Sequence, residues 1–110
     1  MKVEYERSGC KQFFKKHKNE IKLIKHCIEE ALTIQVETGM AKVKRAASER
    51  VNGDCVYECR VNLKKIGSAR VAFIVDEQSL ITVIYISSTL QKDAFTHLLE
   101  RNLKENHYSA

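Results

Sequence analysis

Three segments that favour β-strands follow one another between residues 54 and 87, and they constrain the fold more than any other feature. They are DCVYECRVN, SARVAFIVD and SLITVIYIS, and only LKKIG and a polar DEQ segment separate them. Runs rich in Val, Ile, Tyr and Phe between short polar linkers are typical of strands joined as hairpins. The last two segments are apolar on both faces, as covered central strands are. We expect them in the middle of an antiparallel sheet.

Helical patterns flank these segments on both sides. Residues 8–18 contain two adjacent phenylalanines in a lysine-rich setting and predict a short helix. Apolar residues then recur at three- and four-residue steps up to Gly39, and the same spacing returns over residues 90–106, so we expect two further helices. A short alternating strand at residues 2–6 completes the order βααβββα. The prediction is an α+β fold, in which an antiparallel β-sheet carries an N-terminal helical hairpin and a C-terminal helix.

The chain has 110 residues, which suits a single domain over residues 1–110. Its net charge is +5, with many of the lysines in residues 11–25. A basic surface attracts polyanions such as nucleic acid, although a lysine run is also typical of a solvated helix face. The longest uncharged run contains serines and threonines, and the N-terminus is charged, so we expect no membrane span and no signal peptide. We expect a cytoplasmic protein.

The four cysteines are expected to be reduced thiols in that compartment. Cys10, Cys27, Cys55 and Cys59 form no CxxC pair, and their spacing from the histidines does not match a zinc finger. We therefore expect no metal and no other cofactor. Cys59 lies on the apolar face of its strand and is interpreted as a small buried hydrophobic residue.

One register of the first hairpin gives a consistent core face. It places Tyr57 opposite Phe73, and on the other face it places Arg60 opposite Arg70. Like charges directly opposite cost about 0.2 to 1 kcal/mol, and they invite an anion such as phosphate, which a guanidinium binds through two hydrogen bonds. The alternative is that Arg60 pairs with Glu58 or a helix carboxylate and that Arg70 lies in solvent.

The second hairpin is expected to place Arg70 beside Tyr85 if its loop has two or four residues. A loop of three or five residues would turn Tyr85 to the other face. The start of the last helix, where Ser88 and Gln91 have capping-box spacing, would add amide donors and a positive dipole end near the same rim.

The run GDCVYECRV, the basic loop after it, SARVAFIVDEQ, LITVIYIS and the helix with QKDAF resemble the C-terminal half of the RelE/ParE superfamily of bacterial toxins. The helical hairpin before them suits the N-terminal half, so the resemblance covers nearly the whole chain. It implies a RelE-like toxin of a type II toxin–antitoxin pair, neutralised by a cognate antitoxin protein. RelE-like members cut mRNA in the ribosomal A site by helping the 2′-hydroxyl attack the adjacent phosphate, which implies mRNA and the ribosome as partners.

The resemblance also implies roles for individual residues. Arg70 matches the arginine that opens the strand after the hairpin loop, and Arg60 matches a basic position in the preceding strand. These two would hold the scissile phosphate, while Glu58 or Tyr85 would move protons. Arg50 matches a basic residue before that strand, with Lys44 and Arg45 as alternatives. The residues expected to contact RNA are Lys44, Arg45, Arg50, Lys64, Lys65 and Lys92.

At two positions where RelE-like enzymes often carry an arginine and a tyrosine or histidine, this chain has Thr89 and Phe95. Gln91, Lys92 or His97 are candidates to substitute, although the helical spacing places His97 on the solvent side. We expect an endoribonuclease that inhibits translation without a metal. Two alternatives stay open: a ParE-like inhibitor of DNA gyrase that is not an enzyme, and an inactive relative that only binds an antitoxin or nucleic acid.

Overall fold

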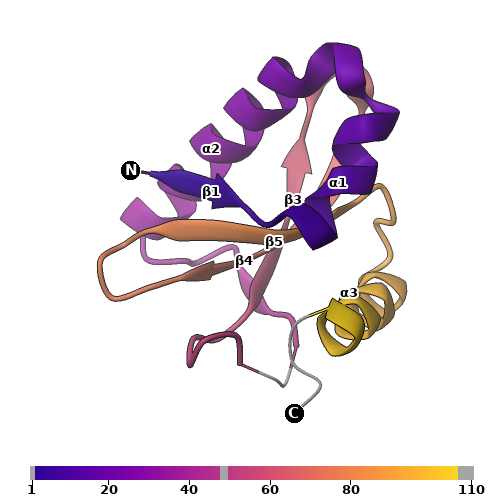
Figure 1. Cartoon of the computed structure of the whole chain (residues 1–110). Helices are drawn as coiled ribbons and strands as arrows, with labels where there is room; N and C mark the ends of the chain where they lie inside the picture. The colour runs from indigo at the N-terminus through magenta and orange to yellow at the C-terminus, as the bar shows by residue number, and fades with distance from the viewer. Residues whose placement is uncertain (1, 48–49, 107–110) are drawn as a thin grey trace.

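The computed structural model describes residues 2–47 and 50–106, which form an α+β fold around a five-stranded sheet (Figure 1). In chain order the elements are β1 (Val3–Tyr5), α1 (Arg7–Lys16), α2 (Ile21–Glu37), β2 (Lys44–Arg45), β3 (Tyr57–Asn62), β4 (Ser68–Val75), β5 (Ile81–Ser87) and α3 (Lys92–Asn106). Short 3-10 turns join α1 to α2 and β3 to β4. The strands lie in the order β1-β5-β4-β3-β2.

The predicted order βααβββα and the purely antiparallel sheet are both corrected. An extra strand, β2, pairs antiparallel with the first two residues of β3, and β1 pairs in parallel with Ile81–Val83, so the sheet is mixed. A two-residue strand is too short to show a period of two, and alternation carries no information on strand direction. The basic segment of residues 41–52 therefore contributes one short strand, while residues 48 and 49 lie outside the described part.

Two layers of helices cover the two faces of the sheet. In Figure 1, α1 and α2 lie above the sheet and α3 lies below it. The buried residues of α2 recur at helical spacing as predicted, and they pack with α1 on one face of β3, β4 and β5. Phe95, Leu99 and Leu103 of α3 pack on the other face, whereas Ala94 is exposed. Among the described residues, no helix is long and apolar enough to cross a lipid bilayer.

The two hairpins differ in how well the sequence predicts their registers. The first hairpin has the predicted register, with Tyr57 opposite Phe73 and Arg60 opposite Arg70. The second contains a β-bulge, because Ala72 pairs with Tyr85 while the next residue of β4 pairs with Val83. One residue of β5, Ile84, is therefore skipped. As a result Tyr85 lies opposite Ala72, and the predicted position beside Arg70 is wrong.

Helix α1 packs directly on the backbone of this bulge. A Cβ atom at Gly9 would lie 1.6 Å from the carbonyl oxygen of Ile84. Only glycine permits this approach, because no real Cβ tolerates backbone at that distance. Gly9 thus sets the distance between α1 and β5.

We predict that Gly9→Ala destabilises the protein by about 2 kcal/mol or more, because α1 must move away from β5. The direction of the change in stability distinguishes this site from others, since Gly→Ala at an ordinary helical position stabilises a protein by about 0.5–1 kcal/mol. Urea unfolding measures the difference, and Lys15→Ala, an exposed change in the same helix, is the control, expected within about 0.5 kcal/mol of the parent. A Gly9→Ala protein as stable as its parent would contradict the packing.

Buried thiols lie in the core between the helical hairpin and the sheet. Desolvation by burial raises the pKa of the Cys10 thiol to about 12, with a further contribution from Glu6. Burial also raises the pKa of the Cys59 thiol to about 11, and Glu58 adds to the shift. Both thiols therefore stay protonated in the folded protein at neutral pH.

These raised pKa values predict a loss of stability in alkali. Because the folded state holds the thiol protons more tightly, its contribution is complete below about pH 9 and is lost as pH rises through the folded-state pKa values. The free energy of unfolding should therefore fall between about pH 9 and pH 12, as pH rises through the folded-state pKa values of Cys59 and Cys10. The double variant Cys10→Ala and Cys59→Ala should show a shallower fall, whereas an unchanged slope would show that these thiols do not carry the effect.

Candidate anion-binding face

Two arginines lie side by side on the sheet face that α3 covers only in part. Strand pairing places Arg60 of β3 directly opposite Arg70 of β4, and Ser87 of β5 lies opposite Arg70 on its other side. This is the arrangement predicted for the first hairpin. The row therefore brings two guanidinium groups and one hydroxyl to the same face of the sheet.

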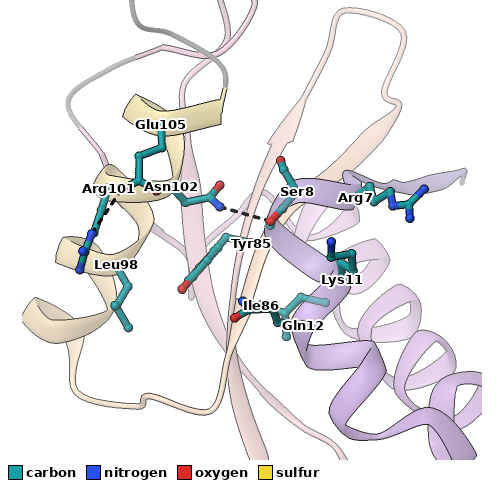
Figure 2. A pocket seen from close by; sticks show the side chains of 11 residues that line it. Arg7, Ser8, Lys11, Gln12, Tyr85, Ile86, Leu98, Arg101, Asn102 and Glu105 are labelled. Atoms are coloured by element: carbon teal, nitrogen blue, oxygen red, sulfur yellow. Dashed lines mark hydrogen bonds and ion pairs between the residues drawn. The ribbon is translucent and has the colours of Figure 1, made fainter.

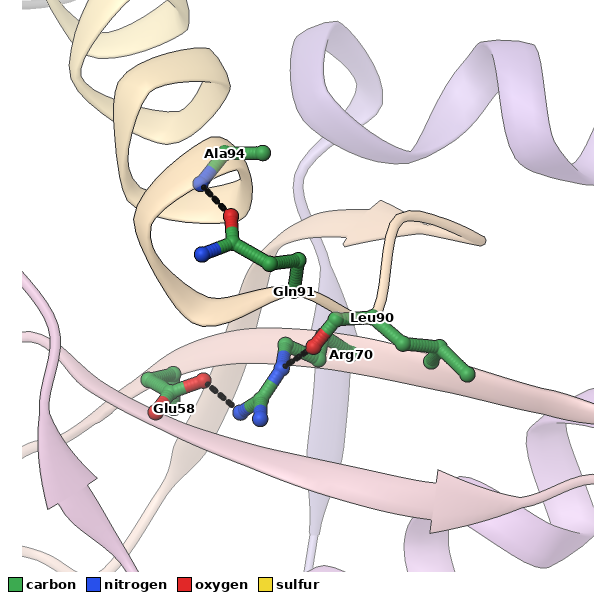
Figure 3. Close-up of polar contacts among 5 residues, drawn as sticks. All are labelled: Glu58, Arg70, Leu90, Gln91 and Ala94. Carbon is green, nitrogen blue, oxygen red and sulfur yellow. Dashed lines mark hydrogen bonds and ion pairs between the residues drawn. The ribbon is translucent and has the colours of Figure 1, made fainter.

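Arg70 is fixed by two short hydrogen bonds (Figure 3). Its Nη1 donates to Oε2 of Glu58 at 2.5 Å, and its Nε donates to the carbonyl oxygen of Leu90 at 2.5 Å. A guanidinium has five N–H donors, so further donors remain. The side chain keeps 20% of its surface exposed. Arg70 can thus present an oriented donor edge to a ligand without breaking either bond.

Glu58 is the only charged side chain that is buried in the part of the chain that the structure describes, with 1% of its side chain exposed. Its ion pair with Arg70 offsets the cost of removing the carboxylate from water. The expected ion pair is therefore present, but its cation is Arg70 instead of Arg60. A carboxylate held in this way does not reach a substrate hydroxyl, so we assign Glu58 to holding Arg70.

The exposed cations on this face are Arg60 and Lys44. Lys44 of β2 pairs with Glu58 across the strands, which places its side chain on the same face as Arg60. Neither side chain has an ion-pair or hydrogen-bond partner within residues 2–47 and 50–106. We name Lys44, Arg60 and Arg70 the anion-binding face. Arg45 pairs with Tyr57 and belongs to the opposite face.

The first turn of α3 begins beside Arg70. The helix starts at Lys92, and Oε1 of Gln91 accepts a hydrogen bond from the backbone N–H of Ala94 at 2.6 Å. Gln91 is thus the cap, and the predicted cap at Ser88 is wrong because the loop runs further than its sequence spacing indicated. The Leu90 carbonyl that accepts from Arg70 comes just before this cap, so Arg70 ties the start of α3 to β4. Lys92 is exposed at this end.

Tyr85 lies in a groove between α1 and α3 (Figure 2). Its ring centroid is 5.7 Å from that of Phe95, and burial raises the pKa of its hydroxyl. Phe95 itself is fully buried and cannot contact a substrate. Tyr85 shares the sheet face of Arg70, as predicted, but it lies diagonally from Arg70 instead of directly opposite and lines the groove.

The other predicted RNA contacts lie on loops around the sheet. Arg50 donates from Nη1 to the carbonyl oxygen of Gly53 at 3.1 Å, in the turn before β3. Lys64 and Lys65 are exposed in the turn between β3 and β4, and Lys65 forms an exposed ion pair with Glu20 at 3.4 Å. All three side chains are exposed.

One feature of this face could not be predicted from residue types. The Leu90 acceptor is a backbone carbonyl, which every residue carries.

His97 is exposed on α3 as predicted. In the described residues, no three His, Cys, Asp or Glu side chains gather in an arrangement that could hold a metal ion. Comparison of the chain with protein-family models, with curated proteins and with solved structures found no match.

We predict that Glu58→Ala destabilises the protein by about 2–4 kcal/mol, because it leaves the Arg70 charge without its partner. The estimate lies below the range for fully buried pairs because Arg70 is partly exposed. Arg60→Ala, a change at the exposed neighbour, is the control and should cost no more than about 0.5 kcal/mol. Denaturant unfolding of both variants gives the comparison, and equal losses would contradict the assignment of the ion pair to Arg70.

Proposed function

We propose that this chain is a RelE/ParE-like toxin that binds RNA phosphate on the anion-binding face and cleaves mRNA on the ribosome. The observation that carries the proposal is the pair of opposed arginines, of which Arg70 is fixed and Arg60 is exposed, with no partner among the residues that the structure describes. A phosphodiester approaching this face meets two guanidinium groups at once. The α+β fold with a helical hairpin before the sheet is compatible with the sequence resemblance to that family.

The proposed chemistry is attack of the 2′-hydroxyl on the adjacent phosphate, without a metal. A 2′,3′-cyclic phosphate forms, the bond from phosphorus to the 5′-oxygen of the next nucleotide breaks, and a base from the ribosome, the substrate or the loops around the face takes the 2′ proton, while the 5′-oxygen leaves protonated. Arg60 and Arg70 bind the phosphate and stabilise the negative charge that grows on its oxygens in the transition state. The fixed geometry of Arg70 makes it the orienting group, because its hydrogen bonds need not reorganise during the reaction. Lys44 and the exposed cations at Arg50, Lys64 and Lys92 add contacts to the RNA backbone.

A second candidate is inhibition without cleavage, as in ParE-like relatives that bind DNA gyrase. It is favoured by the positions of the two groups expected to move protons: Glu58 is buried in an ion pair and Tyr85 lies in the groove between α1 and α3. Attack by a 2′-hydroxyl needs a base to take its proton. Both candidates use the same face, and they differ in whether a bond is broken.

The proposal also includes a cognate antitoxin as the protein partner and the cytoplasm as the compartment. The protein acts in the cytoplasm, where ribosomes and mRNA are found. Its cognate antitoxin covers Lys44, Arg60 and Arg70 and so blocks access of phosphate. An inactive relative that only binds an antitoxin or nucleic acid would show no toxicity at any expression level.

We predict that Arg60→Ala removes growth inhibition in bacteria and lowers mRNA cleavage by about 100-fold or more, the effect typical of losing one transition-state donor. Lys104→Ala, which removes an exposed cation from α3, is the matched control and should keep full toxicity. Arg70→Lys keeps a cation beside Glu58 but removes the planar guanidinium group. A variant that stays folded and loses activity would support the orienting role of Arg70.

Mapping of mRNA ends and a DNA-damage reporter, measured in the same cells, separate the two candidates. Translation arrest with cut mRNA supports the nuclease. Induced DNA damage with intact mRNA supports the gyrase inhibitor. Full toxicity of Arg60→Ala would refute both, because each depends on this face.

A further inference from the structure

The groove between α1 and α3 has a structural cause in the sheet edge. Strand β1 pairs only with Ile81–Val83, so the following part of β5 has no neighbouring strand on that side. Helix α1 begins there and α3 lies across from it (Figure 2), leaving a groove of about 770 Å3. Tyr85 and Ile86 form its floor. The groove therefore exists because β1 is shorter than β5.

Cations line both rims of this groove. Arg7 and Lys11 are four residues apart on α1 and share one side of that helix, while Arg101 lies on α3. Arg7 and Lys11 have no ion-pair partner within the described part of the chain. Arg101 pairs with Glu105 at 3.4 Å, but both side chains are largely exposed. Such a pair is weak, so an incoming carboxylate can replace Glu105.

The walls of the groove are held in place before any ligand binds. Nδ2 of Asn102 on α3 donates to the carbonyl oxygen of Ser8 on α1 at 3.3 Å, which joins the two helices at one end (Figure 2). The contact of Gly9 with the Ile84 backbone fixes α1 on β5. A preformed groove lowers the ordering cost of binding.

We propose that this groove binds an acidic peptide segment of a protein partner. Carboxylates of the segment would meet Arg7, Lys11 and Arg101 on the rims, and its apolar side chains would pack on Tyr85 and on Leu98 of α3. The basic net charge of the chain favours such a partner.

A peptide suits the groove better than an RNA strand does. RNA binding in grooves of this kind depends on an exposed aromatic face on which bases stack. The Tyr85 ring is half-buried and packs against Phe95, so it does not offer such a face. Mixed apolar and basic lining is what an acidic amphipathic segment requires.

The proposal does not depend on the nuclease. No residue of the anion-binding face lines the groove. Loss of RNA cleavage, or its absence from the start, therefore leaves the peptide result unaffected, and the two proposals can fail separately.

The test uses a fluorescein-labelled 12-residue peptide made of Glu-Glu-Leu repeats, with binding to the full-length protein measured by fluorescence anisotropy. The double variant Arg7→Glu and Lys11→Glu should weaken binding by about 10-fold or more. The double variant Lys15→Glu and Lys16→Glu makes the same charge change at exposed positions of the same helix that do not line the groove, and it should stay within about 2-fold of the parent. These exposed changes leave the core intact.

Three outcomes would overturn the proposal. The first is no binding of the peptide to the parent protein. The second is equal weakening by the two double variants, which would mean attraction by net charge alone. The third is binding of a 12-nucleotide oligouridine in place of the peptide, with the same dependence on Arg7 and Lys11.

Discussion

The ion pair between Glu58 and Arg70 is the interaction on which both the anion-binding face and the attachment of α3 depend. A carboxylate with 1% exposure has lost its hydration, and the guanidinium replaces the lost water with a charge and a hydrogen bond. The same guanidinium also holds the Leu90 carbonyl just before α3. One side chain therefore joins β3, β4 and the start of the C-terminal helix, and its orientation follows from structural demands that exist without a ligand.

This arrangement gives the two opposed arginines different properties. The negative charge of Glu58 offsets the positive charge of Arg70, and this lowers the repulsion between the directly opposed Arg60 and Arg70. One positive charge remains uncompensated, and Lys44 adds a second. A phosphodiester carries a single negative charge, so the face can bind it without a large excess of attraction that would hinder release. In the proposed function, Arg70 orients the anion because Glu58 holds it, and the exposed Arg60 and Lys44 attract the anion.

The sequence predicted those parts of the fold that depend on alternation within adjacent segments. The register that pairs Arg60 with Arg70 could be predicted because a shift by one residue would expose the apolar face. The bulge at Ile84 could not, since it is one skipped residue within an apolar run, at the place where Gly9 of α1 packs on the backbone. The ion-pair partner of Glu58 could not be predicted from the alternation either. Arg60 lies on the same face of the same strand, and Arg70 lies diagonally across on the neighbouring strand, so both are within reach. The hydrogen bond in the structure shows that the partner is Arg70.

The bulge also determines how the two candidate functions relate. By skipping Ile84 it places Tyr85 opposite Ala72, where the hydroxyl faces the groove and burial raises its pKa. The sheet therefore supplies two guanidinium groups for phosphate at one place and its half-buried phenol at another. Binding of phosphate needs only the first of these, whereas cleavage needs a proton acceptor in addition. On this geometry the strands themselves supply the two guanidinium groups that the proposed phosphate binding needs, and the proposed cleavage needs in addition a base from the ribosome, the substrate or the loops around the face.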